Sequence, residues 1–589
     1  MIFTLCGANG FLAKSSTLGK FKESIFQVRS GQQHIGKAER DCFLGGLFIN
    51  EDLVFHLSPR EKQVLQMVCT GQTLTTGCMC ITSRSTSQAS LFIIVFIYIS
   101  DLNECLTYMK VKALSIYFCV SLVLYTCHTV SAQQQCNCLA NLDTTITKTE
   151  LNYVGYPDMI ARKLLPQYTR QVAKLRKDAA KESDPIKCFP ILNAYVSFFN
   201  DKHFDIEYSI TDTTRFEYNN LNEDAFKKDF TTQKRDSIEG IWINPDSTLR
   251  LAVQKVSPIT YQAVVLQSKD PKTKPGLVYY TFTRDKNGFV FNRYDWMTPD
   301  FPVRQRGGLL FVWNFEVWAK TYPSTITEYE RAEFSTWRNY NYGLDCKKLD
   351  NNHVLLSIGS FNRDDKIKAM IQKNDSLIRS TKNLIVDLRG NGGGNSGWTY
   401  LLPYFYTAPI VQGNTYLRLS PDNIKSNLAD IKSTYEKPTK DPRWVRSYTP
   451  EVIEQYKKAY EEIPLSKNQF YSLPSLTLYS DSILQTPEKI ALVFDDLGGS
   501  STEYFFYISM QSKKTRRYGE RTLGMMDYMG VSQQTKLPFE DYYLLIPDRK
   551  AAWTDAKPTN KTGFVPEHDL RHIPRQKWID YIRTDLEKL

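Results

Sequence analysis

Two glycine-rich turns carry the residue types that acyl transfer requires. The first follows an apolar run at residues 384–386 and reads RGNGGG at residues 389–394. Glycines let a backbone approach a ligand closely and turn its N–H groups toward one point. The second follows the run KIALVF at residues 489–494, which is apolar after its lysine, and ends in a glycine pair and Ser500, at the start of a predicted helix. One turn can therefore offer amide donors for an oxyanion, and the other a nucleophilic hydroxyl.

Two other interpretations of the first turn are weaker. A nucleotide-binding loop would need a further glycine three positions after Gly392, or a Gly-Lys-Ser/Thr ending, and the sequence has neither. Glycines that only permit close packing of a strand on a helix would explain the first turn. A set of oxyanion donors is favoured because it also explains the serine in the second turn.

Five sequence blocks occur in the order seen in one peptidase family. They are VLLSIGSF at 354–361, DLRGNGGG at 387–394, SSTE at 500–503, YGERTLG at 518–524 and GFVPE at 563–567. In these blocks the chain resembles the C-terminal processing peptidases, the tail-specific and tricorn-like serine peptidases. The resemblance implies an α/β catalytic domain with a ClpP/crotonase-like layered sheet. It also implies a serine peptidase that acts on proteins or peptides and needs no metal or organic cofactor.

The resemblance assigns a nucleophile and an oxyanion hole. Ser500 matches the nucleophile because it lies three residues before Glu503. Ser501 is the rival hydroxyl. The amides of Gly393, or of a neighbouring glycine, and of Ser501 would face the oxyanion. A serine at a helix start also places the positive end of the helix dipole beside the developing negative charge.

The general base differs from that of the tail-specific members. Those peptidases carry a lysine directly after the Thr-x-Gly turn, where this chain has Met525 and Met526. Tricorn-like members use a histidine from the preceding helical domain, and His203 in the run FFNDKH at 198–203 matches it. Histidine suits the task because its ordinary pKa lies near neutral pH. The competing histidines are His353 and His568.

The acid that would orient His203 is not evident at the family's position. Tricorn-like members place a glutamate there, where this chain has Thr559 and Asn560. Asp527 is our substitute for it, although an ordinary turn aspartate is an equal alternative. Glu503 is expected to tie down its helix rather than to react.

The pattern of apolar and polar residues changes along the chain and suggests three domains. We expect a helical domain at 133–232, a small antiparallel β domain at 233–348, as a barrel or a sandwich, and the α/β domain at 349–589. Within the last, we expect a strand at 354–358 and a helix at 364–378. An insertion at 412–480 contains one predicted helix, at 450–461, and forms either a lid or a surface excursion.

Residues 109–132 have the pattern of a secretory signal peptide. A basic start at 109–112 precedes an apolar core at 113–125, and small residues at 130–132 allow cleavage before Gln133. The sequence therefore predicts an exported protein, periplasmic or extracellular, with no membrane span after cleavage. Lipid attachment at Cys127 and an uncleaved anchor are the alternatives.

Residues 1–108 precede this export signal and form an unexpected leader. The first 76 resemble the end of a response-regulator receiver domain followed by a truncated LuxR-type helix-turn-helix. We expect that a neighbouring reading frame was joined to the true start at Met109. The helix that would read DNA is missing, and the net charge of +11 comes from scattered basic residues. Nucleic-acid binding by the mature chain is therefore not expected.

Cysteine usage fits an exported protein. Of twelve cysteines, eight precede Gln133, and Cys136, Cys138, Cys188 and Cys346 remain after it. An even number in an exported protein favours disulfides, with Cys136 or Cys138 bonded to Cys188.

The sequence therefore indicates an exported serine peptidase, either an endopeptidase or a C-terminal processing enzyme, that works through an acyl-enzyme on Ser500. The alternative is a non-catalytic binding protein on the same fold, with a hydrophobic ligand or a peptide as its partner. The missing lysine and the uncertain acid motivate that alternative.

Overall fold

The structure of the chain is a computed structural model that describes residues 2–4, 11–13, 136–230, 234–298, 300–531 and 534–588. It divides into two compact units, residues 1–129 and 130–589. In the first unit, β1 (Ile2–Thr4) pairs antiparallel with β2 (Phe11–Ala13). The rest of the predicted leader and the predicted signal peptide at 109–132 lie outside the described residues. Within the described residues, no helix has the length and apolar character needed to cross a bilayer.

The second unit opens with helices, as predicted. They are α6 (Cys138–Asn152), α7 (Tyr156–Ala161), α8 (Leu165–Ala179) and α9 (Pro185–Val196). The side chain of Asp184 caps α9 by accepting from two amides of its first turn, and a proline follows at the first helical position. A disulfide between Cys138 and Cys188 joins α6 to α9, which confirms one of the two pairings expected. Cys136 stays a free thiol.

Not all of the predicted helical stretch is helical. After α9 the chain forms a short 3-10 turn at Ser197–Phe199 and then the strand β3 (Asp205–Ser209), before a last helix, α10 (Glu223–Phe230). β3 buries Ile206 and Tyr208 against the helices, next to Phe204, which directly precedes the strand. It pairs antiparallel with β24 (Tyr542–Leu545), which lies near the end of the chain. This pairing connects the helical segment to the C-terminal part of the unit.

The β region is a closed barrel. Eight antiparallel strands follow one another around it, and a pairing of β10 with β8 closes the circle. The strands are β4 (Gly240–Ile243), β5 (Leu249–Lys255), β6 (Thr260–Ser268), β7 (Val278–Asp285), β8 (Gly288–Arg293), β10 (Pro302–Arg306), β11 (Leu309–Val312) and β12 (Glu316–Tyr322). Of the two architectures expected, barrel and sandwich, the structure has the barrel.

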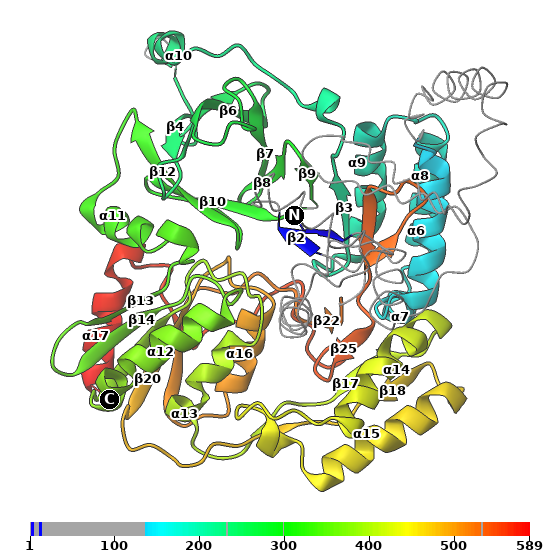
Figure 1. Cartoon of the computed structure of the whole chain (residues 1–589), viewed down its shortest axis with the longest axis vertical. Helices are drawn as coiled ribbons and strands as arrows, with labels where there is room; N and C mark the ends of the chain where they lie inside the picture. Colours follow the sequence, from blue (N-terminus) through cyan, green and yellow to red (C-terminus); the bar gives the residue numbers. More distant parts are fainter. Residues whose placement is uncertain are drawn as a thin grey trace, which may run out of the picture. The chain divides into compact units, whose positions relative to one another are not determined.

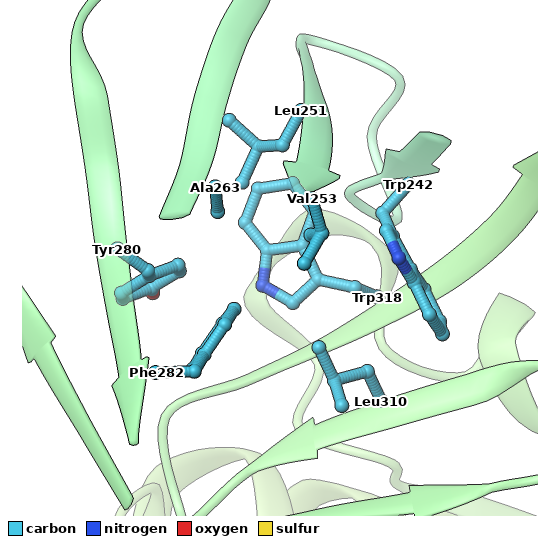
Figure 2. A pocket seen from close by; sticks show the side chains of 8 residues that line it. All are labelled: Trp242, Leu251, Val253, Ala263, Tyr280, Phe282, Leu310 and Trp318. Carbon is cyan, nitrogen blue, oxygen red and sulfur yellow. The ribbon is translucent and has the colours of Figure 1, made fainter. Parts of the chain in front are cut away.

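The barrel interior is filled by its own side chains. Figure 2 shows eight of them turned toward one another around Trp318. All eight are buried, and most are aromatic or branched aliphatic. In a barrel of eight strands, large side chains are enough to fill the interior. The interior of the barrel is therefore a packed core.

The α/β part contains a six-stranded sheet in the order β13-β14-β15-β20-β21-β26. Figure 1 labels β13, β14 and β20 of this sheet. Only β13 runs antiparallel to its neighbour. The strands are β13 (Asp345–Lys348), β14 (His353–Ser357), β15 (Asn383–Asp387), β20 (Lys489–Phe494), β21 (Thr515–Gly519) and β26 (His568–Asp569). The strands predicted from the two apolar runs are confirmed as β15 and β20.

Helices cover both faces of this sheet. Helices α12 (Asp364–Arg379) and α16 (Ser501–Ser509) pack with Leu384 and Val386 on one face. Helix α17 (Trp578–Lys588) packs with Ile385 on the other. Because successive side chains of a strand point to opposite faces, a strand covered on both sides must be apolar throughout. This explains the unbroken apolar run, and α12 confirms the helix predicted at 364–378.

The insertion at 412–480 contains two helices, α14 (Pro421–Glu436) and α15 (Pro450–Glu462). Helix α15 was predicted and α14 was not. The insertion also supplies β17 (Thr415–Arg418) and β18 (Phe470–Ser472) to a four-stranded sheet that β25 (Arg549–Ala551) and β22 (Tyr528–Met529) complete. The insertion is therefore joined by backbone pairing to the segment after residue 527.

Candidate active site

Ser500 stands between β20 and α16 in a strained backbone conformation. Its φ of 49° and ψ of −123° belong to a region that glycine favours and other residues seldom adopt. Such a conformation costs about 1 to 3 kcal/mol and persists only where the surroundings enforce it. The Ser500 side chain is half-buried. The sharp turn leaves its hydroxyl beside the helix start.

The two glycine-rich turns adjoin, as the sequence predicts. Gly393 has a φ of +104°, and a Cβ built on it would lie 2.7 Å from both the Gly499 carbonyl oxygen and Ser500 Cβ. The same Cβ would lie 3.0 Å from the Ser501 amide nitrogen. Only glycine permits this approach, because any side chain would meet backbone atoms of the other turn.

Asn391 holds the first turn against α16. Its Oδ1 accepts from the Gly393 amide at 2.9 Å and from the Thr502 hydroxyl at 2.8 Å. Its Nδ2 donates to the Ile358 carbonyl oxygen at 3.0 Å. One of the two expected oxyanion donors, the Gly393 amide, is thus already bonded within the protein. The other, the Ser501 amide, belongs to the first residue of α16 and has no acceptor within the helix.

His203 lies beside Ser500, although 297 residues separate them. Its Nε2 is 3.2 Å from Ser500 Oγ, and its Nδ1 is 2.8 Å from the Tyr528 carbonyl oxygen. A carbonyl oxygen can only accept, so Nδ1 carries the hydrogen and Nε2 of the neutral ring is free to accept from the serine hydroxyl. This is the tautomer that a general base for Ser500 requires.

The surroundings keep His203 neutral. Burial lowers the pKa of His203 below its ordinary range, while the carbonyls of Tyr528 and Met525 act in the opposite direction. The nearby ammonium of Lys202 lowers the pKa further. A neutral imidazole at neutral pH can accept a proton from a neighbouring hydroxyl.

Asp527 does not occupy the orienting position that the sequence suggested. Its carboxylate accepts from the Thr559 amide at 2.7 Å, from the Thr559 hydroxyl at 2.8 Å and from the Asn560 amide at 2.9 Å. The turn at residues 559–560 therefore satisfies this buried carboxylate. The group on His203 Nδ1 is instead the backbone carbonyl of the next residue, Tyr528.

Glu503 is buried and bonded to the turn that follows β21. It accepts from the Gly524 amide at 2.7 Å and from the Met525 amide at 2.9 Å, and also from the Thr522 hydroxyl. Burial raises the pKa of Glu503 to about 7, and these hydrogen bonds oppose the rise. Glu503 thus joins α16 to the turn at 522–525, the tying role expected of it.

The rival residues occupy other positions. His353 is fully buried, and its Nδ1 lies 2.9 Å from an oxygen of Asp350. The ring of His568 stacks on Tyr518, with centroids 4.4 Å apart. The hydroxyl of Ser501 is buried and makes no hydrogen bond within the described part of the chain. Of the competing groups, only His203 has a ring nitrogen within hydrogen-bonding distance of Ser500 Oγ among the described residues.

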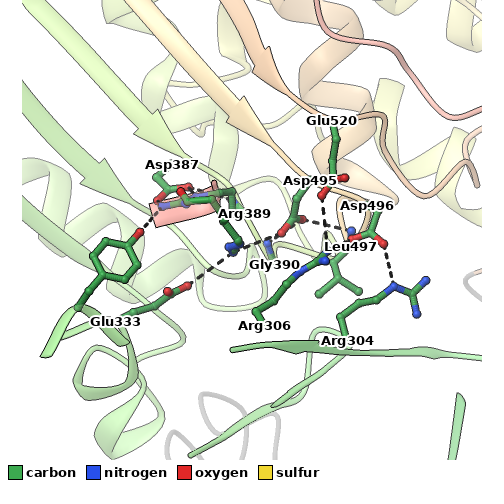
Figure 3. A network of polar contacts seen from close by, with 12 residues as sticks. Arg304, Arg306, Glu333, Asp387, Arg389, Gly390, Asp495, Asp496, Leu497 and Glu520 are labelled. Atoms are coloured by element: carbon green, nitrogen blue, oxygen red, sulfur yellow. Dashed lines mark hydrogen bonds and ion pairs between the residues drawn. The ribbon is translucent and has the colours of Figure 1, made fainter. Parts of the chain in front are cut away.

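A network of hydrogen bonds and ion pairs connects the two turns (Figure 3). Asp495 Oδ1 accepts from the Gly390 amide at 2.9 Å and from the Leu497 amide at 3.2 Å, so one carboxylate holds both turns. Its Oδ2 lies 3.4 Å from Arg575. The next residue, Asp496, pairs with Arg304 of the barrel strand β10 at 2.7 Å. The barrel is therefore tied to the turn that carries Ser500.

Sequence reasoning missed three groups that shape the site. Asn391 lies inside the glycine motif, so its position was visible but its hydrogen bonds were not. Asp495 follows directly on β20, where a carboxylate after a buried strand is a weak signal. The Tyr528 carbonyl leaves no signal, since every residue has a carbonyl and only the fold decides which one faces a histidine.

Comparison with known proteins agrees with the α/β part of the site. Residues 353–566 match the model of Peptidase family S41, a range that includes Gly393 and Ser500 but not His203. This match supports a peptidase. A comparison with curated proteins found no match.

Three solved structures illustrate the overall likeness. Mature CPAF complexed with lactacystin has a TM-score of 0.42 and 12% identity over 76% of this chain and 97% of its own. The photosystem II D1 C-terminal processing protease has a TM-score of 0.31 and 11% identity over 74% and 93%. The tricorn protease has a TM-score of 0.33 and 12% identity over 76% and 36%. At these low TM-scores we infer nothing about activity from the solved structures.

Proposed function

We propose that this chain is an exported serine peptidase that hydrolyses peptide bonds through an acyl-enzyme on Ser500. The observation that carries the proposal is the 3.2 Å distance between His203 Nε2 and Ser500 Oγ, with Nδ1 held by a carbonyl oxygen. The match of residues 353–566 to a peptidase family supports the same reaction class.

The reaction would begin with attack of Ser500 Oγ on the substrate carbonyl carbon. His203 Nε2 takes the hydroxyl proton as the new C–O bond forms, and the carbonyl oxygen becomes an oxyanion. The tetrahedral intermediate then loses its amine, which receives the proton from Nε2. In the second half, water attacks the acyl carbon and loses a proton to Nε2. The bond from that carbon to Ser500 Oγ then breaks, and Nε2 returns the proton to Oγ as the acid leaves. Every proton passes through the one imidazole.

The oxyanion would face the start of α16. The Ser501 amide is our first donor, because it has no acceptor within the helix and lies at the positive end of the helix dipole. The Gly393 amide is the second and shares its hydrogen between Asn391 Oδ1 and the oxyanion. Removing one such donor typically costs about a hundredfold to a thousandfold in rate.

Export of the protein is part of the proposal. The disulfide between Cys138 and Cys188 supports an oxidising compartment, the periplasm or the cell exterior. The substrates would then be exported or extracellular proteins, cleaved either internally or near their C-termini.

One observation favours the alternative, a binding protein on this fold without turnover. The Gly393 amide donates to Asn391 Oδ1, so one oxyanion donor is occupied.

A denatured protein incubated with the chain separates the two functions. We expect peptides with new termini from the wild-type chain and none from Ser500→Ala, while Ser501→Ala retains cleavage. A chain that binds the denatured protein but yields no new termini in any form would establish the alternative instead.

A further inference from the structure

The side chain of Asn560 forms hydrogen bonds with two buried aspartates near His203, Asp201 and Asp527. Asp201, Asp527 and Asn560 are each at most 6% exposed. Asn560 Nδ2 donates to Asp201 Oδ1 at 3.3 Å, and Asn560 Oδ1 accepts from the Asp527 amide at 2.9 Å. The backbone amide of Asn560 also donates to Asp527 Oδ2 at 2.9 Å.

The segments that carry these two aspartates contact different parts of His203. Asp201 Oδ1 accepts from the His203 backbone amide at 3.0 Å, and the Tyr153 hydroxyl donates to its Oδ2 at 3.0 Å. Asp527 directly precedes Tyr528, whose carbonyl oxygen accepts from His203 Nδ1. Asn560 therefore connects the group that holds the His203 backbone to the segment that holds its ring.

The chemistry of this position requires an amide. Its side chain must donate to the carboxylate of Asp201 and accept from the backbone of Asp527 at the same time, which a primary amide can do. An ionised carboxylate there would accept but not donate, and it would add a third negative charge to the cluster. Burial already raises the pKa of Asp201 to about 7, and the charge of Asp527 adds to the rise.

We infer that Asn560 is the positioning residue of the proposed peptidase, which sets the orientation of His203 toward Ser500 through Asp201 and Tyr528. The inference rests on the proposed function, because it concerns the base of that reaction. Asn560 touches neither Ser500 nor the His203 ring in the hydrogen bonds described. It acts on the reaction only through the groups that hold His203.

A pair of matched substitutions in the full-length chain tests this role. Asn560→Asp keeps the shape of the side chain and removes the donor. Asn427 of α14 provides the control, because it is 3% exposed and its Nδ2 donates to the buried carboxylate of Asp548 at 2.7 Å. Asn427→Asp thus makes the same chemical change away from His203. Asn560→Ala is the second variant, in case Asn560→Asp fails to fold.

The readout is the labelling of Ser500 by a fluorophosphonate at increasing reagent concentration. For Asn560→Asp and Asn560→Ala we expect the limiting rate to fall about tenfold or more, with an unchanged half-saturating concentration, because a displaced base slows the chemical step and not reagent binding. Asn427→Asp should keep the wild-type limiting rate.

The outcomes separate this inference from the proposed function. Wild-type labelling with unaltered limiting rates in both Asn560 variants would overturn the inference and leave the peptidase intact. An equal fall in Asn427→Asp would also overturn it, since the loss would then be one of general stability. A wild-type chain that is not labelled at all would overturn the proposed function and the inference together.

Discussion

At the scale of single residues, Ser500 has an energetically unfavourable backbone conformation, and its position at the candidate site explains why. The conformation with φ near 49° suits glycine, yet the chain has a serine there. A residue with a purely structural role at this turn would be expected to be glycine, which adopts the conformation without strain. The strain is the expected mark of a side chain placed for chemistry rather than for stability.

Replacement of Ser500 should therefore separate stability from function. We expect Ser500→Gly to be more stable than Ser500→Ala by about 1 kcal/mol, because glycine relieves the strain and alanine keeps the Cβ that causes it. Chemical denaturation of the two variants measures the difference. Both should lack hydrolysis. Equal free energies of unfolding would mean that residue 500 is not strained in solution.

The protonation state of His203 sets the expected pH dependence of hydrolysis. The proposed base, His203, can accept a proton only when neutral, and burial lowers its pKa below the ordinary value of 6.5. As the pH falls, the imidazole becomes protonated and the rate declines, so the half-maximal point of kcat/KM should lie below pH 6.5. A pH–rate profile on a peptide substrate measures this point. A half-maximal point above 6.5 would contradict the environment that we describe for His203.

At the scale of elements, the two parallel strands β15 and β20 bring the glycine turns together. Their carboxyl ends lie at the same edge of the sheet, so the turns that follow them meet although the insertion separates them in sequence. Asp495 then fastens one turn to the other. The approach of Gly393 to Ser500 follows from sheet register and from this one carboxylate.

Loss of the Asp495 side chain should cost far more than loss of a surface partner. Asp495→Ala leaves the Gly390 amide unbonded and removes a charge partner of Arg575, with an expected loss of about 3 to 5 kcal/mol in the free energy of unfolding. Asp569→Ala breaks an ion pair with Arg571, in which both side chains are at least 42% exposed, and should cost about 1 kcal/mol or less. Denaturant titrations of the two variants test the contrast, and similar losses would contradict it.

At the scale of the whole molecule, the site depends on segments from distant parts of the chain. The histidine follows the N-terminal helices, the serine belongs to the α/β sheet, and the carbonyl on the histidine comes from β22. The disulfide between Cys138 and Cys188 joins two of those helices, α6 and α9. The helix α9 leads directly into the segment that carries His203.

Opening of this disulfide should destabilise the helical region. A bond that closes a loop of 50 residues typically contributes about 2 to 5 kcal/mol. We expect Cys188→Ser to lower the thermal unfolding midpoint, and reductant to lower that of the wild-type chain in the same way. Cys346→Ser, which replaces a free thiol, should leave it nearly unchanged. A Cys188→Ser midpoint equal to that of the wild-type chain would mean that the bond adds no stability.

The sequence predicts much of this molecule where local pattern and function coincide. The apolar runs of β15 and β20 reveal strands buried on both faces, and the glycines reveal turns that must approach other backbone. Helix α14 was not predicted, because most of its residues are polar. The strand β3 was not predicted, because it is short and follows a helical stretch. Asp527 was assigned to orient His203 because a carboxylate usually has that role. In the structure, the backbone carbonyl of Tyr528 contacts His203 Nδ1 instead.

The location of a covalent fluorophosphonate adduct tests the central claim most directly. After reaction with the wild-type chain, tandem mass spectrometry of its peptides identifies the modified residue. We expect the adduct on Ser500, formed about a hundredfold more slowly or worse in His203→Ala and at the wild-type rate in His568→Ala. An adduct on Ser501, or none on the wild-type chain, would contradict the assignment of Ser500 and His203 as nucleophile and base.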